Sequence, residues 1–156
     1  MKLAAAGKPI VLNFWGGSCP PCRAEMPGFQ RAYERNQDDF LMVGLDVGAF
    51  FGLGTRSSAL ALLDELAITY PAAFTTSRAP ISQFGATALP PTFFFDGNGN
   101  LVSSRIGFID EAEFERLTTA IGKDHKKMLG SEGVVPLGAT IEVNITSKTE
   151  QAPAYN

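Results

Sequence analysis

The sequence predicts an α/β fold in which a mixed central β-sheet is flanked by helices. Apolar runs of strand length alternate with segments of helical composition in the first half of the chain, as in parallel strands joined by right-handed crossovers. Residues 96–100, Asp-Gly-Asn-Gly-Asn, then separate two apolar runs, and such turn clusters predict an antiparallel hairpin. The 156 residues, 45% of them hydrophobic, suit one domain with a single core.

The elements are predicted from apolar periodicity and from the residues that interrupt it. Residues 10–15 are apolar at nearly every position, which suits a strand covered on both faces. Leu60, Leu63 and Ala67 predict the buried face of a helix, and Pro27 should kink the helix that contains it. The expected strands are 10–15, 40–46, 72–75, 92–95 and 101–106, and the expected helices are 19–35, 57–68, 81–84 and one that begins near residue 110.

The domain is expected to end with its last helix. Asp110, with Glu113 three residues later, is a capping-box-like start for this helix. Beyond Lys123 the chain becomes basic and then rich in glycine and proline. We therefore predict one domain over residues 1–123 and a C-terminal extension over 124–156. Apolar and polar residues alternate over 140–146, which predicts an edge strand within an otherwise loop-like extension.

Composition and charge exclude several classes of function. The chain has 13 basic and 16 acidic residues and no long run of either sign, so we expect neither nucleic acid nor an anionic membrane as a partner. No apolar stretch reaches the roughly 18 residues of a membrane span. Because a strand-like run already begins at Ile10, Met1 is expected to mark a trimmed start, with any export signal or anchor absent from this chain.

Cys19 and Cys22 are the only cysteines, so they indicate a reactive site and not a disulfide framework. They follow a buried strand and open a helix, where unpaired N–H groups and the helix dipole favour a Cys19 thiolate by about 1 kcal/mol. Pro20 and Pro21 remove two N–H donors, so the pair should be less oxidising than one with histidine between the cysteines. Cys22 is expected to resolve the mixed disulfide that Cys19 forms.

Other interpretations of these and neighbouring residues are weaker. Tetrahedral zinc needs about four ligands, and the chain offers two cysteines and the distant His125. A two-residue spacer closes too short a loop for a stabilising disulfide. The segment 52–57 lacks the third glycine of a dinucleotide loop, and 96–100 lacks the continuation of a calcium loop. We therefore predict no metal and no cofactor, a plain connecting loop at 52–57 and a solvated His125.

Three segments resemble the TlpA/ResA-like thioredoxins. They are Val-Leu-Asn-Phe-Trp-Gly at 11–16, Cys-Pro-Pro-Cys-Arg-Ala-Glu-Met-Pro at 19–27 and Leu-Pro-Pro-Thr-Phe-Phe-Phe-Asp at 89–96. The resemblance covers residues 7–123 and implies a thioredoxin-like fold with a helix-and-strand insertion before a cis-proline. It implies that the Leu89–Pro90 peptide bond is cis and faces the cysteine pair.

The resemblance also assigns roles to individual residues. Those expected to bind substrate are Pro90, Leu89, Trp15 and Gly107. Glu25 shares a helical face with Cys22, and the resemblance makes it a proton relay for that thiol; the alternative is a solvated surface carboxylate. Asn13 stands where thioredoxin has a buried aspartate, which leaves Glu25 as the remaining relay candidate.

Two departures from the family pattern stand out. Ser18 replaces the tryptophan that usually precedes the first cysteine, which predicts a more polar substrate-facing surface. The usual N-terminal hairpin is missing or clipped, and the strand expected at 140–146 either fills its place or pairs with another molecule.

The function that the resemblance implies is reduction of protein disulfides outside the cytoplasm, with cytochrome c maturation as one setting for it. Its partners would be proteins with disulfides and an upstream thiol or membrane electron donor. Two alternatives are a disulfide-forming oxidase of the same fold and a thioredoxin-like binding module whose cysteines are not redox-active.

Overall fold

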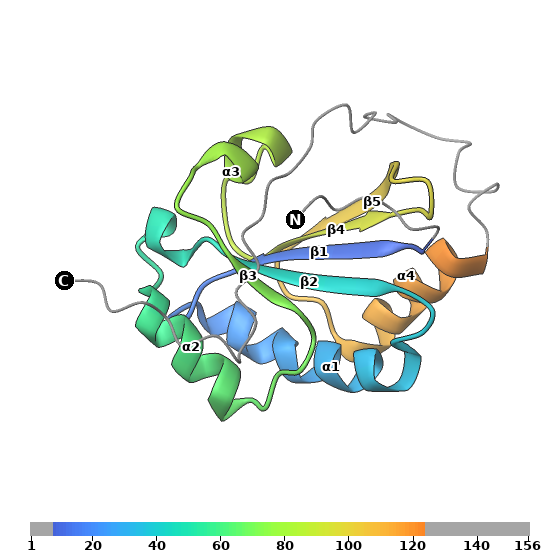
Figure 1. Cartoon of the computed structure of the whole chain (residues 1–156), viewed down its shortest axis with the longest axis horizontal. Helices are drawn as coiled ribbons and strands as arrows, with labels where there is room; N and C mark the ends of the chain where they lie inside the picture. The colour runs from blue at the N-terminus through green and yellow to red at the C-terminus, as the bar shows by residue number, and fades with distance from the viewer. Residues whose placement is uncertain (1–7, 124–156) are drawn as a thin grey trace.

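The computed structural model describes residues 8–123, which form a five-stranded sheet with strand order β3-β2-β1-β4-β5 (Figure 1). The central strand β1 (Ile10–Trp15) pairs in parallel with β2 (Leu41–Asp46), and β2 pairs in parallel with β3 (Ala72–Phe74). On its other side β1 pairs antiparallel with β4 (Pro91–Phe95), which forms a hairpin with β5 (Leu101–Ile106). The mixed sheet and the hairpin are therefore confirmed, whereas the predicted strand at 140–146 lies outside the described residues.

Helices cover both faces of this sheet. Their bounds are α1 (Pro20–Asn36), α2 (Arg56–Glu65), α3 (Ala79–Phe84) and α4 (Glu111–Lys123), with a 3-10 helix η1 (Gly48–Phe51) after β2. Buried residues of α1, α2 and α4 join one core cluster, whereas α3 contributes to a second cluster on the opposite face. Figure 1 shows the same two layers.

Alternation along β1 decides which side chains face the cysteines. Because neighbouring residues of a strand point to opposite faces, Val11 and Trp15 enter the α1 cluster, and Leu12 and Phe14 enter the α3 cluster. All six residues of β1 are buried, as predicted for a central strand. Asn13 lies two residues before Trp15, so its side chain points to the same face of the sheet, toward α1.

The end of α2 differs from the prediction. The expected helix reached residue 68, but α2 ends at Glu65, and Ala67 adopts a left-handed backbone with φ of 51°. The N–H of Ile68 donates to Leu63 O and that of Ala67 to Asp64 O, which is the Schellman arrangement of a helix C-terminus. Ala67, expected on the buried helix face, is consequently exposed. The other boundaries lie within two residues of the predicted ones.

Candidate active site

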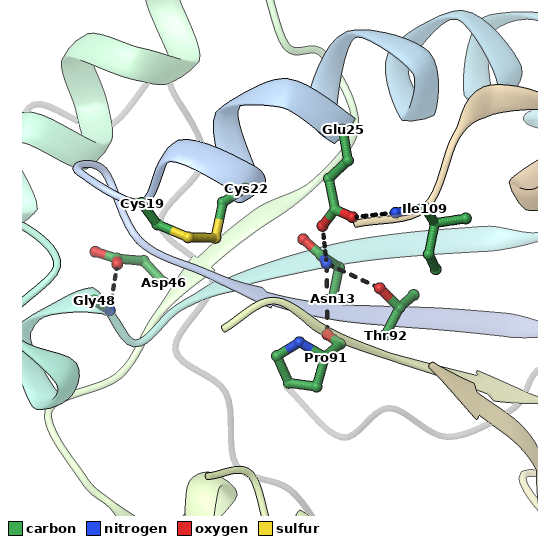
Figure 2. The surroundings of a disulfide bond; sticks show 9 residues. All are labelled: Asn13, Cys19, Cys22, Glu25, Asp46, Gly48, Pro91, Thr92 and Ile109. Carbon is green, nitrogen blue, oxygen red and sulfur yellow. Dashed lines mark hydrogen bonds between the residues drawn. A yellow bond between two sulfur atoms is a disulfide. The ribbon is translucent and has the colours of Figure 1, made fainter. Parts of the chain in front are cut away.

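The cysteine pair lies at the start of α1, as predicted. Cys19 is the N-cap residue, Cys22 lies in the first turn, and the two form a disulfide with 5.2 Å between their Cα atoms (Figure 2). Cys19 is 2% exposed and Cys22 is fully buried. This small difference in exposure does not distinguish an attacking from a resolving sulfur, so that distinction rests on the N-cap position of Cys19.

The backbone before α1 offers few hydrogen-bond donors to the Cys19 sulfur. The N–H of Ser18 donates to Leu53 O at 2.9 Å, and that of Cys19 donates to Gly16 O at 3.2 Å. Pro20 and Pro21 have no N–H. Four consecutive residues, 18–21, therefore have either no N–H or one that is already engaged, which limits the stabilisation of a Cys19 thiolate.

Glu25 lies in the protein interior, one turn beyond Cys22 on α1. Its side chain is 1% exposed, and both side chains project from α1 toward the sheet (Figure 2). Its Oε1 accepts a hydrogen bond from Asn13 Nδ2 at 3.0 Å, and its Oε2 accepts one from the Ile109 N–H at 3.1 Å. Burial raises the pKa of Glu25 to about 8 although both hydrogen bonds favour the charged form. The surface-carboxylate alternative is therefore wrong.

Asn13 connects Glu25 to the strand that follows Pro90. Besides Glu25, its Nδ2 lies 3.1 Å from Thr92 Oγ1 and 3.5 Å from Pro91 O, both on β4. An amide in place of an aspartate thus supplies a donor to the buried carboxyl group and adds no second charge. Sequence reasoning identified the substitution but missed this contact and the one from Ile109.

Leu89, Pro90 and Gly107 come together at the end of the β4–β5 hairpin. The Leu89–Pro90 peptide bond is cis, the isomer that the resemblance implies, and Pro90 is buried. Pro90 O accepts a hydrogen bond of 2.8 Å from the N–H of Gly107, whose φ of 93° favours glycine. The flanking Ile106 and Phe108 are 76% and 56% exposed, the only exposed large hydrophobic side chains in residues 8–123.

Trp15 does not lie where a substrate-lining residue is expected. Its side chain is fully buried and belongs to the core cluster that contains both cysteines. The reason is its parity on β1, which turns the indole inward toward α1 and against Gly44 of the neighbouring strand. Trp15 therefore supports the pair from inside the core.

Asp46, at the end of β2, is a second buried acid that sequence reasoning missed. Its Oδ1 accepts a hydrogen bond from the Gly48 N–H at 3.0 Å (Figure 2). Burial raises the pKa of Asp46, whereas this hydrogen bond and the charge of Arg56 oppose the shift. No cluster of three or more His, Cys, Asp or Glu side chains in the described part of the chain is placed to hold a metal ion. Nor is any helix within 8–123 long and apolar enough to cross a membrane.

Comparisons with known sequences give a family and a set of relatives. The profile of the AhpC/TSA family matches residues 2–104. The thiol-disulfide oxidoreductase ResA of Bacillus anthracis is 29% identical over 101 residues, which are 65% of this chain and 56% of the relative. ResA of Bacillus subtilis is 26% identical over 106 residues, 68% of this chain and 57% of the relative. The chain thus spans less than two thirds of these relatives.

Solved structures share the fold. A thioredoxin family thiol:disulfide interchange protein from Chlorobium tepidum superposes with a TM-score of 0.66 at 25% identity, covering 76% of this chain and 83% of that one. StoA from Bacillus subtilis gives a TM-score of 0.64 at 20% identity, covering 72% and 83%. The predicted thioredoxin-like fold and the resemblance to ResA-like proteins are confirmed.

Proposed function

The chain belongs to the AhpC/TSA family, and on that premise we propose that it is a thiol-disulfide oxidoreductase that reduces protein disulfides outside the cytoplasm. The observation that carries the proposal is the Cys19–Cys22 disulfide at the N-terminus of α1, with the buried Glu25 one turn behind it. The names of the ResA relatives support the same chemistry.

The reaction proceeds in two exchanges. In the reduced protein the Cys19 thiolate attacks one sulfur of a substrate disulfide, whose other sulfur leaves as a thiolate and takes up a proton. The Cys22 thiolate then attacks Cys19 in the mixed disulfide and displaces the second substrate sulfur. Two electrons pass from the protein dithiol to the substrate, and the Cys19–Cys22 disulfide results. An upstream thiol or membrane electron donor restores the dithiol.

Glu25 is the proposed proton acceptor for Cys22. A thiol must lose its proton before it attacks, and transfer is efficient when the pKa of donor and acceptor are similar. The pKa of Glu25, about 8, lies near the thiol value of about 8.5. Asn13 adds no second carboxyl group beside Glu25, and the other buried acid described near the pair, Asp46, accepts a hydrogen bond from the Gly48 N–H.

The scarcity of N–H donors at residues 18–21 supports the direction of reduction. A strongly oxidising pair needs a thiolate that its surroundings stabilise greatly. Here two residues are prolines, and the N–H groups of the other two bond to carbonyl oxygens. A weakly stabilised thiolate favours the disulfide over the dithiol, so the dithiol gives its electrons readily to a substrate.

The segment around Pro90 is the proposed substrate-binding surface. Gly107 N–H and Pro90 O bond to each other and fix this end of the hairpin beside the exposed Ile106 and Phe108. An extended peptide can pair in strand fashion with the backbone of Leu89, directly before the cis bond. Apolar side chains of the substrate would then contact the two exposed residues.

The location outside the cytoplasm rests on relatives. Two solved structures of the same fold are those of a secreted disulfide oxidoreductase of Mycobacterium tuberculosis and an exposed lipoprotein thioredoxin of Streptococcus pneumoniae. The ResA resemblance further suggests apocytochrome c as a substrate. A peptide with an oxidised Cys-x-x-Cys-His motif tests this assignment, because the protein should reduce it faster than a peptide with the two cysteines far apart.

The reduction potential tests the direction of electron flow. We expect equilibration with glutathione to give a value near that of thioredoxin, about −270 mV, and far from the −120 mV or so of strong disulfide-forming oxidases. A value at the oxidising end would support the oxidase alternative. Failure to reduce any protein disulfide, including insulin, would favour a binding module.

A further inference from the structure

The loop that follows β2 meets the segment that precedes Cys19 backbone to backbone. A methyl group on Gly16 would lie 2.8 Å from the Cα of Gly48 and 2.7 Å from Leu53 O, and one on Gly48 would lie 2.7 Å from the Cα of Gly16. Atoms of a real side chain do not approach this closely. The two segments of the chain can therefore touch here only because both positions are glycine.

A second pair of glycines extends this contact. A methyl group on Gly54 would lie 2.9 Å from the backbone nitrogen of Ser18 and 3.1 Å from that of Gly17. One on Gly17 would lie 2.4 Å from the nitrogen of Ala59, in the first turn of α2. Residues 16–18 are thus enclosed between the loop after β2 and the start of α2.

Hydrogen bonds close the same contact. Besides the bond from Ser18 N–H to Leu53 O, the N–H of Val47 donates to Trp15 O at 2.9 Å. The loop is held internally as well, since the N–H of Leu53 donates to Gly48 O at 2.9 Å, and Asp46 binds the N–H of Gly48. We call Gly48, Leu53 and Gly54 the glycine cradle of the active-site segment.

We propose that the glycine cradle is a positioning element that keeps Cys19 within reach of Cys22 in the reduced protein. Leu53 and Gly54, which lie in what resembles a plain connecting loop in the sequence, thereby take part in the redox site without contacting substrate. The proposal deepens the proposed function, because it assigns a role in the exchange between the two cysteines.

The physical basis is the effective concentration of one thiol toward the other. When the protein dithiol reacts with glutathione disulfide, the products are the protein disulfide and two glutathione thiols, so atoms and electrons balance. The equilibrium constant has units of concentration and rises as the two cysteines are held closer to bonding geometry. Displacement of residues 16–18 should therefore lower this equilibrium constant.

The test is Gly48→Ala, compared with Gly52→Ala as the matched control. Gly48 lacks a positive φ, so its methyl group adds no left-handed backbone strain and acts through its close contacts with Gly16, Leu53 O and Asp46 Oδ1. Gly52 lies in the same loop with φ of 67°, and its methyl group would have no neighbour within 4 Å. The control therefore introduces backbone strain into the loop without entering the cradle contact.

We expect Gly48→Ala to lower the glutathione equilibrium constant about tenfold and Gly52→Ala to leave it unchanged. A purely structural role would lower thermal stability in both variants and shift the constant in neither, which would overturn the proposal. Equal shifts in both variants would also overturn it. This equilibrium can be measured whether or not the protein reduces protein substrates, so the insulin assay fails or succeeds independently.

Amide hydrogen exchange of the unmodified protein covers the case in which Gly48→Ala does not fold. The Ser18 N–H, bonded to Leu53 O, should be protected in the disulfide form and remain protected after reduction. If reduction exposes this amide to exchange at the rate of an open chain, the cradle does not hold Cys19 in the dithiol form and the proposal is wrong.

Discussion

At Glu25, burial and hydrogen bonding have opposite effects on the pKa of the side chain. The folded protein holds its pKa near 8 against an ordinary value of 4.5. Between these pH values the folded state therefore binds a proton that the unfolded state has lost. The free energy of unfolding must then decrease as the pH rises from about 5 to 8, by at most about 4 kcal/mol.

Glu25→Gln should remove this pH dependence. The amide keeps the size of the side chain but does not titrate, so its free energy of unfolding should be nearly flat between pH 5 and 8. Denaturant unfolding of the disulfide form isolates the effect, because neither cysteine titrates there. Glu34→Gln, an exposed change on the same helix, should retain the slope of the parent. A slope that survives in Glu25→Gln would show that another group carries it.

Trapping experiments should distinguish the roles of the two cysteines. Cys22→Ser leaves an attacking thiolate at Cys19 with no resolving partner, so mixed disulfides with substrate proteins should accumulate and disappear on addition of reductant. Cys19→Ser should trap little. Titration should give the lower thiol pKa to the variant that retains Cys19, which alone occupies the N-cap of α1. Equal trapping by both variants contradicts the assigned roles.

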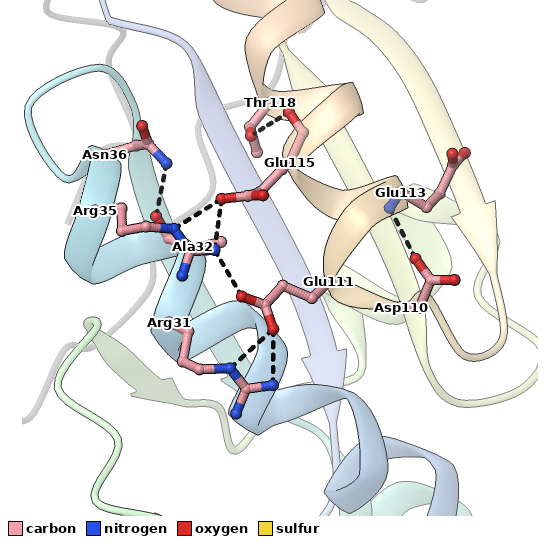
Figure 3. A network of polar contacts seen from close by, with 9 residues as sticks. All are labelled: Arg31, Ala32, Arg35, Asn36, Asp110, Glu111, Glu113, Glu115 and Thr118. Carbon is pink, nitrogen blue, oxygen red and sulfur yellow. Dashed lines mark hydrogen bonds and ion pairs between the residues drawn. The ribbon is translucent and has the colours of Figure 1, made fainter.

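Among the elements, α4 depends on a cap at its start and on ion pairs along its side. The N–H of Glu113 donates to Asp110 Oδ1 at 2.8 Å, which confirms the predicted cap. Glu113 pairs with Arg116 and does not complete the predicted box. Toward α1, two arginines pair with two glutamates of α4 (Figure 3): Arg31, Arg35, Glu111 and Glu115.

Asp110→Ala should cost about 1 kcal/mol in the free energy of unfolding, because the N–H of Glu113 loses its acceptor. Asp110→Asn keeps an acceptor at this position and should be close to neutral. Arg35→Ala removes exposed ion pairs, so its smaller effect should shrink further as salt is raised. Denaturant unfolding at low and high salt distinguishes the two mechanisms. An Asp110→Ala effect that salt abolishes would refute the cap as its cause.

Helices and strands are predicted correctly from the sequence where neighbouring residues determine them. The continuous apolar run of β1, the prolines at the start of α1 and the turn residues of the hairpin each act on their own neighbourhood. The end of α2 fails because Ala67 takes the left-handed position that glycine usually occupies. No glycine or proline there marks the end of α2, and the helix ends where Leu63 and Ile68 can both be buried.

For the whole molecule, the unpredicted part of the site consists of contacts between distant segments. Ile109 reaches Glu25 across 84 positions, and Gly48 meets Gly16 only after β1 and β2 pair. Sequence patterns indicated which residues carry chemistry, but the burial of Glu25 and Trp15 depends on the assembled sheet. The glycines of 52–57 looked like an ordinary loop because their neighbours lie on another segment.

The exposed pair beside Gly107 makes the substrate surface testable on the intact molecule. Phe108→Ser removes an aromatic ring that is 56% exposed, so folding should change little. If a substrate covers this ring, the KM for a protein disulfide should rise by roughly fivefold, equivalent to about 1 kcal/mol of lost apolar contact. The rate with glutathione disulfide, too small to reach both sites, serves as the control. If the reaction with glutathione disulfide is also impaired, the substitution acts at the cysteines and not on the substrate-binding surface.

Trp15 is the chain's single tryptophan, and it lies in the same core cluster as both cysteines. Disulfides quench indole emission on contact, whereas water shifts that emission to longer wavelength. Intensity should therefore follow the redox state of the pair, and wavelength should follow unfolding. We therefore expect the emission of Trp15 to distinguish the two events in one spectrum.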